Sequence, residues 1–265
     1  MPLYETLAAV YDWLVPDALL APEGSAAAFV PALAGVPAGG RLLDCAAGTG
    51  QVAVGLALRG FAVTATDASP AMVERTRALA REHGAAVEAE ACAWEELSAR
   101  PWAGGFDAVL CVGNSLTHAR GRERRRAALG AMAGVLRPGG LLLLTSRNWE
   151  RLRAARPGLE VEEALVVRPG GAGLVIRSWT FAEAWDAPHE LEVAVAVLGP
   201  GGRVSTAAER MPFWPFTHDA LREDVLAAGL APVASTYTDE AERYLVSARR
   251  RADAPGSAIG RTAAG

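Results

Sequence analysis

The feature that most constrains the fold is an alternation of strand-like and helix-like segments that starts at residue 41. Short apolar runs typical of strands are expected at 41–45, 61–66, 85–91, 106–112 and 140–146. Helical segments are expected between them at 51–59, 69–83 and 122–136. Strands that alternate with helices of this length predict a parallel sheet covered by helices on both faces.

The alternation stops after Trp149 and resumes near residue 217. Strand-like runs separated by Pro/Gly turns are expected at 161–168, 173–181, 191–198 and 204–212. A helix at 217–228 and strands at 231–237 and 243–249 then restore the first pattern. The predicted fold class is therefore α/β: a Rossmann-like, doubly wound, mostly parallel seven-stranded sheet with an antiparallel β insertion that caps the site.

This organisation divides the chain into four parts. Residues 1–37, with helices at 3–20 and 26–33, form an N-terminal helical segment over the site. Residues 38–150 and 216–250 together form the main α/β domain, and residues 151–215 form the inserted antiparallel cap. Residues 251–265 are polar and rich in alanine and glycine, which predicts a disordered tail.

Charge and composition exclude several partners and enzyme classes. The net charge of −4 argues against nucleic acid, and no run of about 18 apolar residues predicts a membrane span. The basic run at 120–126 is interpreted as a solvated helix face. All 26 basic residues are arginine, so a lysine Schiff base and a P-loop lysine are excluded.

Cysteine and histidine usage points to a cytoplasmic protein without a metal. Cys45, Cys92 and Cys111 lie in apolar runs and are expected to be reduced core residues, and no secretory signal is visible. The histidines at 83, 189 and 218 lack the spacing of metal ligands, so no metal site is expected. A small molecule is the expected partner, and the sequence allows a homo-oligomer.

A glycine loop follows the first strand in the sequence Asp44-Cys-Ala-Ala-Gly48-Thr-Gly50. Gly48 and Gly50 let the backbone turn sharply beside a ligand, and Asp67 at the end of the next strand can accept both hydroxyls of an adenosine ribose. The glycines also satisfy the dinucleotide fingerprint G-x-G-x-x-A, with a pyrophosphate at the helix N-terminus. Asp44 favours another ligand, because its carboxylate would repel a pyrophosphate but suits the ammonium of a methionine moiety.

These motifs resemble the class I S-adenosylmethionine-dependent methyltransferases, and more narrowly the glycine/sarcosine N-methyltransferase group. The loop is similar to that group's D-x-A-x-G-T-G, and residues 60–69 to its G-F-x-V-T-x-x-D-A-S. Phe106-Asp-Ala-Val-Leu-Cys-Val-Gly-Asn-Ser-Leu-Thr-His118 resembles F-D-A-V-x-C-x-G-N-S-x-x-H. The turn at 136–140 is typical of the region before the fifth strand of methyltransferases, and Arg147-Asn-Trp resembles R-N-Y. The resemblance is good over 38–150 and loose over 210–250.

The resemblance implies S-adenosyl-L-methionine as the cofactor. The ribose would lie on Asp67, the methionine end near Gly48, the adenine near Trp94, and the methionine carboxylate near His118. The expected cofactor-binding residues are Asp44, Ala46, Gly48, Gly50, Asp67, Ala68, Ala93, Trp94, Val112 and His118. The chain departs from the group at Ala93, where the group has asparagine, and it lacks the group's N-terminal arginine around 22–25.

The resemblance also implies an acceptor site, with Asn114 near the substrate amine and Arg147 on its carboxylate. Asn114, Arg147 and His118 are the expected catalytic residues. For His118, a contact to the cofactor or a helix cap is favoured over a general base, because no carboxylate orients the ring. For Arg147, the alternative is a surface ion pair. The expected substrate-binding residues are Tyr11, Asn114, Arg147, Phe213 and Trp214. The three aromatic residues among them are as readily core residues.

The predicted function is in-line transfer of a methyl group to a small molecule, at an amine nitrogen of a carboxylate-bearing substrate. Three alternatives stay open: an O- or C-methyltransferase of a larger metabolite, a donor-binding protein without catalysis, and a nicotinamide oxidoreductase.

Overall fold

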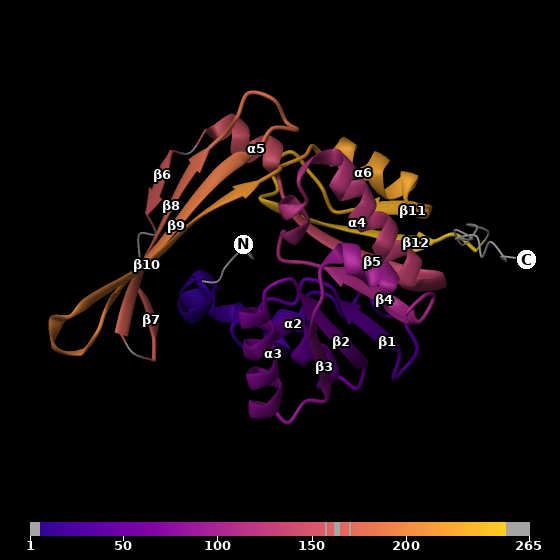
Figure 1. The fold of residues 1–265 in the computed structure, drawn as a ribbon, viewed down its shortest axis with the longest axis horizontal. Helices are drawn as coiled ribbons and strands as arrows, with labels where there is room; N and C mark the ends of the chain where they lie inside the picture. Colours follow the sequence, from indigo (N-terminus) through magenta and orange to yellow (C-terminus); the bar gives the residue numbers. More distant parts are fainter. Residues whose placement is uncertain (1–5, 157, 162–164, 170, 253–265) are drawn as a thin grey trace, which may run out of the picture.

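The computed structural model describes residues 6–156, 158–161, 165–169 and 171–252. Two β-sheets make up most of this part of the chain, and the N-terminal segment lies between them (Figure 1). The larger sheet carries helices on both of its faces. The smaller sheet is antiparallel and rises beside the carboxyl ends of the parallel strands.

The larger sheet has seven strands in the order β11-β12-β5-β4-β1-β2-β3. The strands are β1 (Arg41–Asp44), β2 (Ala62–Asp67), β3 (Val87–Ala91), β4 (Phe106–Cys111), β5 (Leu136–Arg147), β11 (Leu230–Ser235) and β12 (Arg243–Arg250). Strands β1 to β5 are parallel to one another, and β12 is antiparallel to both of its neighbours. The strand order reverses between β1 and β4, which is where open α/β sheets bind their ligands.

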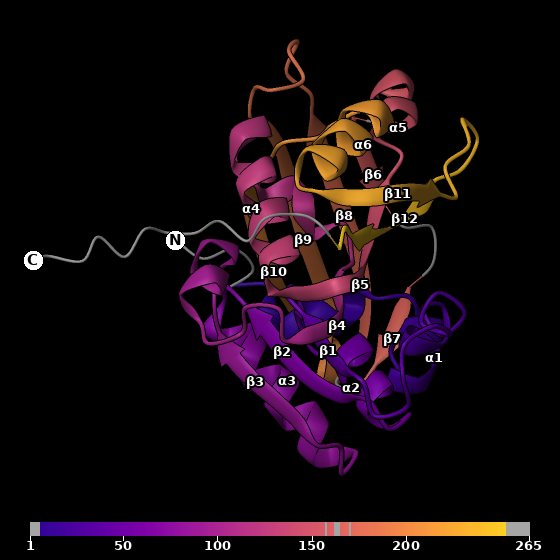
Figure 2. The same ribbon diagram turned by 90° about the vertical axis from the view of Figure 1, so that its right-hand side faces the viewer.

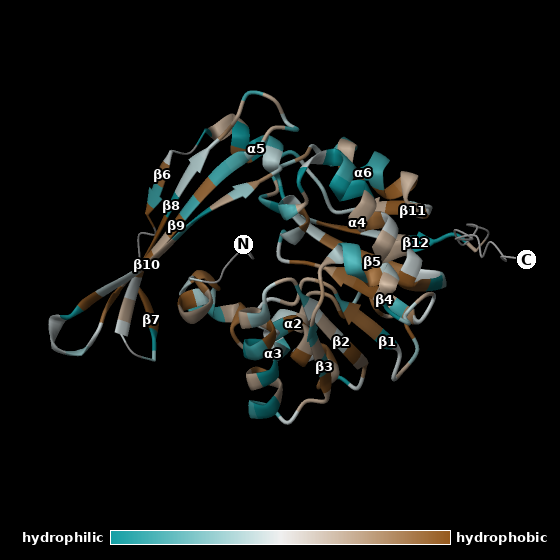
Figure 3. Cartoon of the chain, in the orientation of Figure 1, coloured by the Kyte–Doolittle hydropathy of each residue, from teal (hydrophilic) through white to brown (hydrophobic). Residues whose placement is uncertain are grey.

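The two faces of this sheet bury alternate residues of the same strands. Leu43, Val109 and Leu142 belong to one core, on the side of α4 (Gly121–Val135) and α6 (His218–Ala227). The residues that precede and follow these in each strand point to the opposite face. They belong to the other core, on the side of α1 (Pro22–Ala27) and α2 (Gln51–Ala57). Helix α3 (Pro70–Glu82) packs against β2 and β3. Figure 2 shows these two helical layers, and Figure 3 shows the apolar strands between them.

The smaller sheet, called the cap from here on, follows helix α5 (Trp149–Ala155). Its strands are β6 (Leu159–Val161), β7 (Val166–Arg168), β8 (Gly171–Thr180), β9 (His189–Leu198) and β10 (Val204–Phe213). Their order is β10-β9-β8-β6, with β7 also paired to β8. Trp149 stacks on Phe213 with ring centroids 5.0 Å apart, and both rings contact Trp179 edge-on. This aromatic cluster joins the cap to the larger sheet.

The N-terminal segment forms two short 3-10 helices, η1 (Ala8–Leu14) and η2 (Asp17–Leu19). Arg75 of α3 holds it to the larger sheet through an ion pair of 2.6 Å with Asp12. Arg168 of the cap donates to the carbonyl oxygens of Asp12 and Val15 at 3.0 and 2.8 Å. The segment is thus tied to both sheets and covers the carboxyl ends of the parallel strands.

The predicted fold class is confirmed, and four local predictions are corrected. The helices expected at 3–20 and 26–33 are replaced by η1, η2 and α1. Helix α5 was not expected, and the strand expected at 161–168 is two shorter strands, with 162–164 outside the described residues. Arg125, in the basic run expected to be a solvated face, is only 1% exposed. The tail prediction at 253–265 also lies outside the described residues.

The described residues contain neither a helix that could cross a membrane nor a side-chain cluster that could hold a metal ion. No helix among them has both the length and the apolar character to cross a membrane. No group of three or more histidine, cysteine or acidic side chains placed to hold a metal ion was found in the described ranges.

Candidate functional site

Two adjoining cavities open at the carboxyl ends of β1, β2 and β4, with volumes of about 440 and 480 Å³. Ala46, Asp67, Ser115 and His118 line both of them. The smaller cavity is also lined by Ala68, Ala93, Trp94 and Trp214. The larger cavity is also lined by Tyr11, Asp44, Gly48, Val112, Thr145 and Arg243. The two cavities share these lining residues and so form one candidate site, and Tyr11 of the N-terminal segment lines the larger of them.

The glycine loop is locked against the end of β2. The backbone N–H of Gly48 donates to Asp67 Oδ2 at 3.0 Å, and Ser69 N–H donates to Asp67 Oδ1 at 2.9 Å. Thr76 Oγ1 of α3 donates to the carbonyl oxygen of Gly48 at 2.9 Å. Gly48 and Gly50 adopt φ values of 56° and 93°, which side chains disfavour. Asp67 therefore positions the loop and also presents its carboxylate to both cavities.

Substitution of Gly50 by alanine is expected to lower the free energy of unfolding by roughly 1–3 kcal/mol, through backbone strain and crowding. A Cβ atom there would lie 2.9 Å from the Cα, Cγ2 and Oγ1 atoms of Thr76. Because the loop must shift to relieve this contact, affinity for S-adenosylhomocysteine should also fall at least about tenfold, a loss of about 1.4 kcal/mol. Urea unfolding and calorimetry measure the two effects.

The control for this prediction is Gly130→Ala in α4, where a Cβ atom would meet nothing within 4 Å. It should raise stability by roughly 0.5–1 kcal/mol, because alanine favours a helix interior. If Gly50→Ala were as stable as this control, the loop would not be constrained as described.

Asp44 is a buried carboxylate without a full set of partners. Its side chain is 1% exposed, and Oδ1 accepts a weak hydrogen bond of 3.4 Å from Ala46 N–H. Its Oδ2 atom has no hydrogen-bond partner among the described residues. Desolvation by burial, with a smaller contribution from the charge of Asp67, raises the pKa of Asp44 to about 7 although the hydrogen bond from Ala46 opposes the shift. A carboxylate placed in this way is suited to a cationic ligand group in the larger cavity.

The smaller cavity is lined by an indole ring and by small side chains. Trp94 stands at the start of the 3-10 helix η3 (Trp94–Ala99), and its Nε1 donates to the carbonyl oxygen of Cys45 at 2.8 Å. That bond holds the indole between the ends of β1 and β3. Ala68 and Ala93 leave space beside it, so a flat ring can lie against the indole.

Asn114 joins the ends of β4 and β5. It has a φ of 70° at the start of the 3-10 helix η4 (Ser115–His118). Its Oδ1 accepts from the backbone N–H of Arg147 at 3.0 Å, and its Nδ2 donates to Thr117 Oγ1 at 3.3 Å. The guanidinium of Arg147 lies over the ring of Trp179, 5.5 Å from its centroid. The structure thus brings Asn114 and Arg147 together through a hydrogen bond. Neither residue is among those that line the two cavities.

His118 is held in its neutral form. Burial lowers the pKa of its imidazole to about 4, and a hydrogen bond to the backbone of Pro212 only partly opposes this. At neutral pH the ring therefore carries no charge. It can exchange hydrogen bonds with a bound ligand in both cavities, but it is a weak base.

The three aromatic residues expected at the substrate are separated by the structure. Tyr11 lines the larger cavity and Trp214 the smaller one. Phe213 is 2% exposed within the cluster around Trp149 and lines neither cavity. Gly50 also lies behind the lining, at the start of α2. Arg243, which was not expected, lines the larger cavity. Its position opposite Arg147 on neighbouring strands is visible only once the sheet order is known.

Residues 42–140 match the family model described as "Methyltransferase domain". A glycine/sarcosine N-methyltransferase from Parasynechococcus marenigrum is 40% identical over 111 residues, which are 42% of this chain and 39% of that protein. The chain thus matches about two fifths of the length of this curated relative. Arg147, the cap and the N-terminal segment lie outside the residues matched by the family model.

Two solved structures share most of the fold. An S-adenosylmethionine-dependent methyltransferase from Clostridium acetobutylicum superposes with a TM-score of 0.75 at 14% identity, covering 94% of this chain and 99% of its own. An amino pentose methyltransferase from Micromonospora echinaspora, solved with S-adenosylmethionine bound, gives a TM-score of 0.69 at 23% identity. It covers 93% of this chain and 97% of its own. The likeness includes the cap as well as the parallel sheet.

Proposed function

Residues 42–140 form a methyltransferase domain of the class I S-adenosylmethionine-dependent kind, and from that premise we propose that the chain methylates a small amine. The donor is S-adenosyl-L-methionine. The acceptor proposed is an amine nitrogen on a carboxylate-bearing molecule, as suggested by the glycine/sarcosine N-methyltransferase relative. The cytoplasmic location and a homo-oligomer stay predictions.

The observation that carries the proposal is the incompletely bonded carboxylate of Asp44. Its Oδ2 atom faces no hydrogen-bond donor among the described residues, yet the side chain lines the larger cavity. The ammonium of the donor's methionine end would supply that donor and a compensating positive charge. A pyrophosphate in the same place would add negative charge beside a buried carboxylate, so a nicotinamide dinucleotide fits poorly.

The remaining cofactor contacts follow the two cavities. Asp67 would accept from the ribose hydroxyls, with the adenine between Trp94, Ala68 and Ala93. The backbone at Ala46 and Gly48 would approach the methionine end, bordered by Val112 and by the neutral His118. Gly50 would act indirectly, because the absence of a side chain there lets the loop pack closely against Thr76.

When bound, S-adenosylmethionine supplies a methyl group on a sulfonium sulfur, which leaves as a neutral thioether when the acceptor nitrogen attacks. The protein has mainly to align the nitrogen and exclude water. Arg147 would hold the acceptor's carboxylate, and Asn114 would fix Arg147 and the end of β4 at the correct separation. Tyr11 and Trp214 would border the acceptor on its open sides.

An acceptor screen with detection of S-adenosylhomocysteine tests this function. Wild type is expected to turn over at least one carboxylate-bearing amine, and Arg147→Met should lower kcat/KM for it by about 10–100-fold, the worth of a charged hydrogen bond. Arg81→Met, on the exposed side of α3, is the control and should leave kcat/KM unchanged.

Each other outcome has a definite meaning. Turnover of alcohols or carbon nucleophiles alone would favour the O- or C-methyltransferase of a larger metabolite. Binding of S-adenosylhomocysteine without turnover of any acceptor would indicate a donor-binding protein. Tight calorimetric binding of NAD without binding of S-adenosylhomocysteine would contradict the proposal as a whole.

A further inference from the structure

The strands of the cap are apolar on both faces of the sheet. On the inner face, Val175 of β8 and Val195 of β9 are fully buried and pack against Val10 and Trp13 of the N-terminal segment. Antiparallel sheets with one face in water normally alternate apolar and polar residues. Residues 193–198 of β9 read Val-Ala-Val-Ala-Val-Leu, without a polar residue. This strand therefore has the composition of one that is covered on both sides.

The opposite side of the cap, called the outer face from here on, carries its side chains in rows across β8, β9 and β10, because register partners in an antiparallel sheet share a face. The two central rows are Leu174, Ala196 and Thr206, and Ile176, Ala194 and Ala208. Nine large apolar side chains of the described residues are exposed, and five of these lie at the margins of the outer face. They are 47–72% exposed: Leu159, Val161, Val167, Leu198 and Val204.

The segments that join the cap to the rest of the chain pack on its inner face. The N-terminal segment contacts Val175 and Val195, and Trp149 of α5 stacks on Phe213. Phe213 is an inner-face residue, since it is two positions from Met211, which packs against Leu7. Figure 1 shows the N-terminal segment between the cap and the larger sheet, so the outer face is turned away from the larger sheet.

The outer face is large for an exposed surface of this kind. Three strands of ten residues, with β6 and β7 beside them, span about 19 Å by about 34 Å, or roughly 650 Å² before side-chain relief is counted. Monomeric proteins rarely expose contiguous apolar patches larger than a few hundred Å². A standard protein interface buries about 800 Å² on each partner. The outer face therefore has the area of one specific interface.

One end of the outer face is polar. Glu190 and Glu192 of β9 lie there, and Arg210 Nε of β10 donates to Glu192 Oε1 at 2.7 Å. An apolar centre with a polar margin is the usual anatomy of a protein interface. A membrane surface fits less well, because anionic lipids attract basic clusters and this end carries two carboxylates for one guanidinium.

The outer face is complementary to itself in the size of its side chains. Leu174 and Ile176 give β8 a row of bulky side chains, whereas Ala194 and Ala196 give β9 a row of small ones. A two-fold axis parallel to the strands, between β8 and β9, would lay the bulky row of one copy over the small row of the other. The two sheets would then pack at the usual spacing of about 10 Å.

We propose that the outer face of the cap binds the outer face of a second copy of the chain, so that the two caps stack into one β-sandwich. This removes the exposed apolar side chains at its margins from water and leaves the charged end at the rim. None of the residues named on the outer face lines either cavity, so dimerisation is separate from the proposed function.

Sedimentation velocity of the full chain over a range of concentrations tests for this dimer. Wild type should sediment as a dimer at micromolar concentration. Ala196→Glu should weaken dimerisation at least about 100-fold, because each copy would bury a carboxylate against apolar side chains. Ala196 is partly exposed in the single chain, so the glutamate reaches water in the monomer and folding should persist. The control, Ala62→Glu, adds the same charge at an exposed position of β2 and should dimerise like wild type.

A monomeric wild type would overturn the inference, and cosedimentation of that monomer with phosphatidylcholine vesicles would assign the outer face to a membrane. A dimer that persists in Ala196→Glu would equally overturn it, since the two copies would then meet on another surface. Calorimetry with S-adenosylhomocysteine checks the folding of each variant, and its failure in wild type would contradict only the proposed function. Leu198→Glu, at a side chain that is 49% exposed, replaces Ala196→Glu should the latter not bind this ligand.

Discussion

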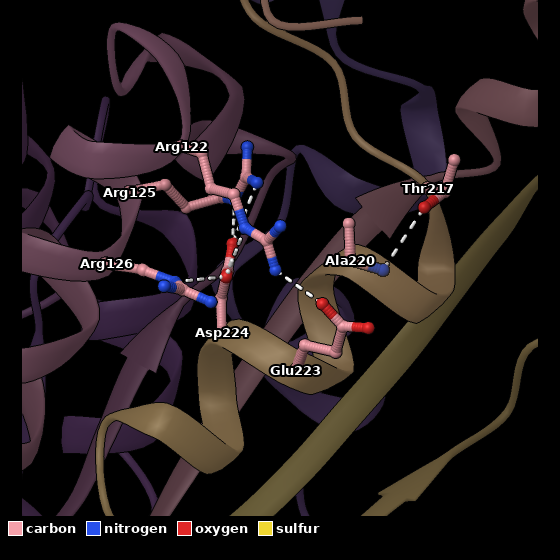
Figure 4. A network of polar contacts seen from close by, with 7 residues as sticks. All are labelled: Arg122, Arg125, Arg126, Thr217, Ala220, Glu223 and Asp224. Carbon is pink, nitrogen blue, oxygen red and sulfur yellow. Dashed lines mark hydrogen bonds and ion pairs between the residues drawn. The ribbon is translucent and has the colours of Figure 1, made fainter.

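Replacing Asp224 with alanine is expected to lower the free energy of unfolding by about 3–5 kcal/mol, the usual effect of removing one partner of a buried ion pair. Figure 4 shows Arg122, Arg125 and Arg126 of α4 converging on this carboxylate of α6. Asp224 is fully buried, and its oxygens accept from the Nε atoms of the three arginines at 2.9, 2.8 and 2.6 Å respectively.

The size of the effect comes from Arg125 rather than from the exposed arginines. The residue is 1% exposed and its guanidinium lies over Phe216, 4.7 Å from the ring centroid, so it cannot turn to water. Without Asp224 it would be a buried charge with no counterion. Burial alone would raise the pKa of Asp224, but hydrogen bonds from Arg126 and Arg122 and the charge of Arg125 hold it below the ordinary value. This stabilisation is therefore present at neutral pH and lost in acid.

Urea unfolding of Asp224→Ala measures this loss, with Glu223→Ala as the matched control. Glu223 is the next residue of α6, and its exposed carboxylate binds the same Arg122. Removing it should cost less than about 1 kcal/mol, as is usual for a surface ion pair. If the two variants were equally stable, Arg125 would not depend on Asp224.

The central sheet could be predicted from the sequence because most of its strands contain short apolar runs and helical segments follow several of them. The same reasoning failed where tertiary contacts decide the structure. The basic run looks like a solvated face, since nothing local shows that Asp224, about 100 residues later, lies beneath it. Helix α5 has only seven residues, which is too short for a periodic apolar signal. Its N-cap residue, Asn148, whose side chain accepts from Arg151 N–H, is nevertheless visible in the sequence.

In the candidate site, too, residues in local motifs could be predicted from the sequence, whereas residues placed by tertiary contacts could not. The residues at the ends of β1 and β2 could be predicted because each lies in a local motif with a known physical requirement, such as Gly50 or Asp67. The acceptor side depends on segments far apart in the chain. Phe213 and Trp214 are neighbours in the sequence, yet one lies in the core and the other in a cavity. Arg243 becomes informative only when β12 is found beside β5.

Replacing Asp44 with asparagine is expected to stabilise the free protein while weakening binding of the donor. Because burial raises the pKa of Asp44 from 3.8 to about 7, this carboxyl favours the folded state at low pH and loses that contribution as the pH rises through 7. At pH 8 the ionised group destabilises the fold, and asparagine removes that effect. The melting temperature of Asp44→Asn should therefore exceed that of wild type at pH 8, with a smaller difference at pH 5.

Binding should change in the opposite direction, since the ammonium of the ligand needs the ionised carboxylate. The Kd of Asp44→Asn for S-adenosylhomocysteine at pH 8 should rise about 10–100-fold, the worth of a charged hydrogen bond. Wild type should itself bind about tenfold more weakly at pH 6 than at pH 8, because the carboxylate must first lose its proton, whereas the variant should show no such dependence. Asp219→Asn, which removes an 89% exposed carboxylate, is the control and should match wild type throughout. A variant that binds as tightly as wild type would show that Asp44 does not meet the ammonium, even if its melting temperature rises as expected. The two measurements thus separate the burial of Asp44, which is a property of the fold, from its use in binding.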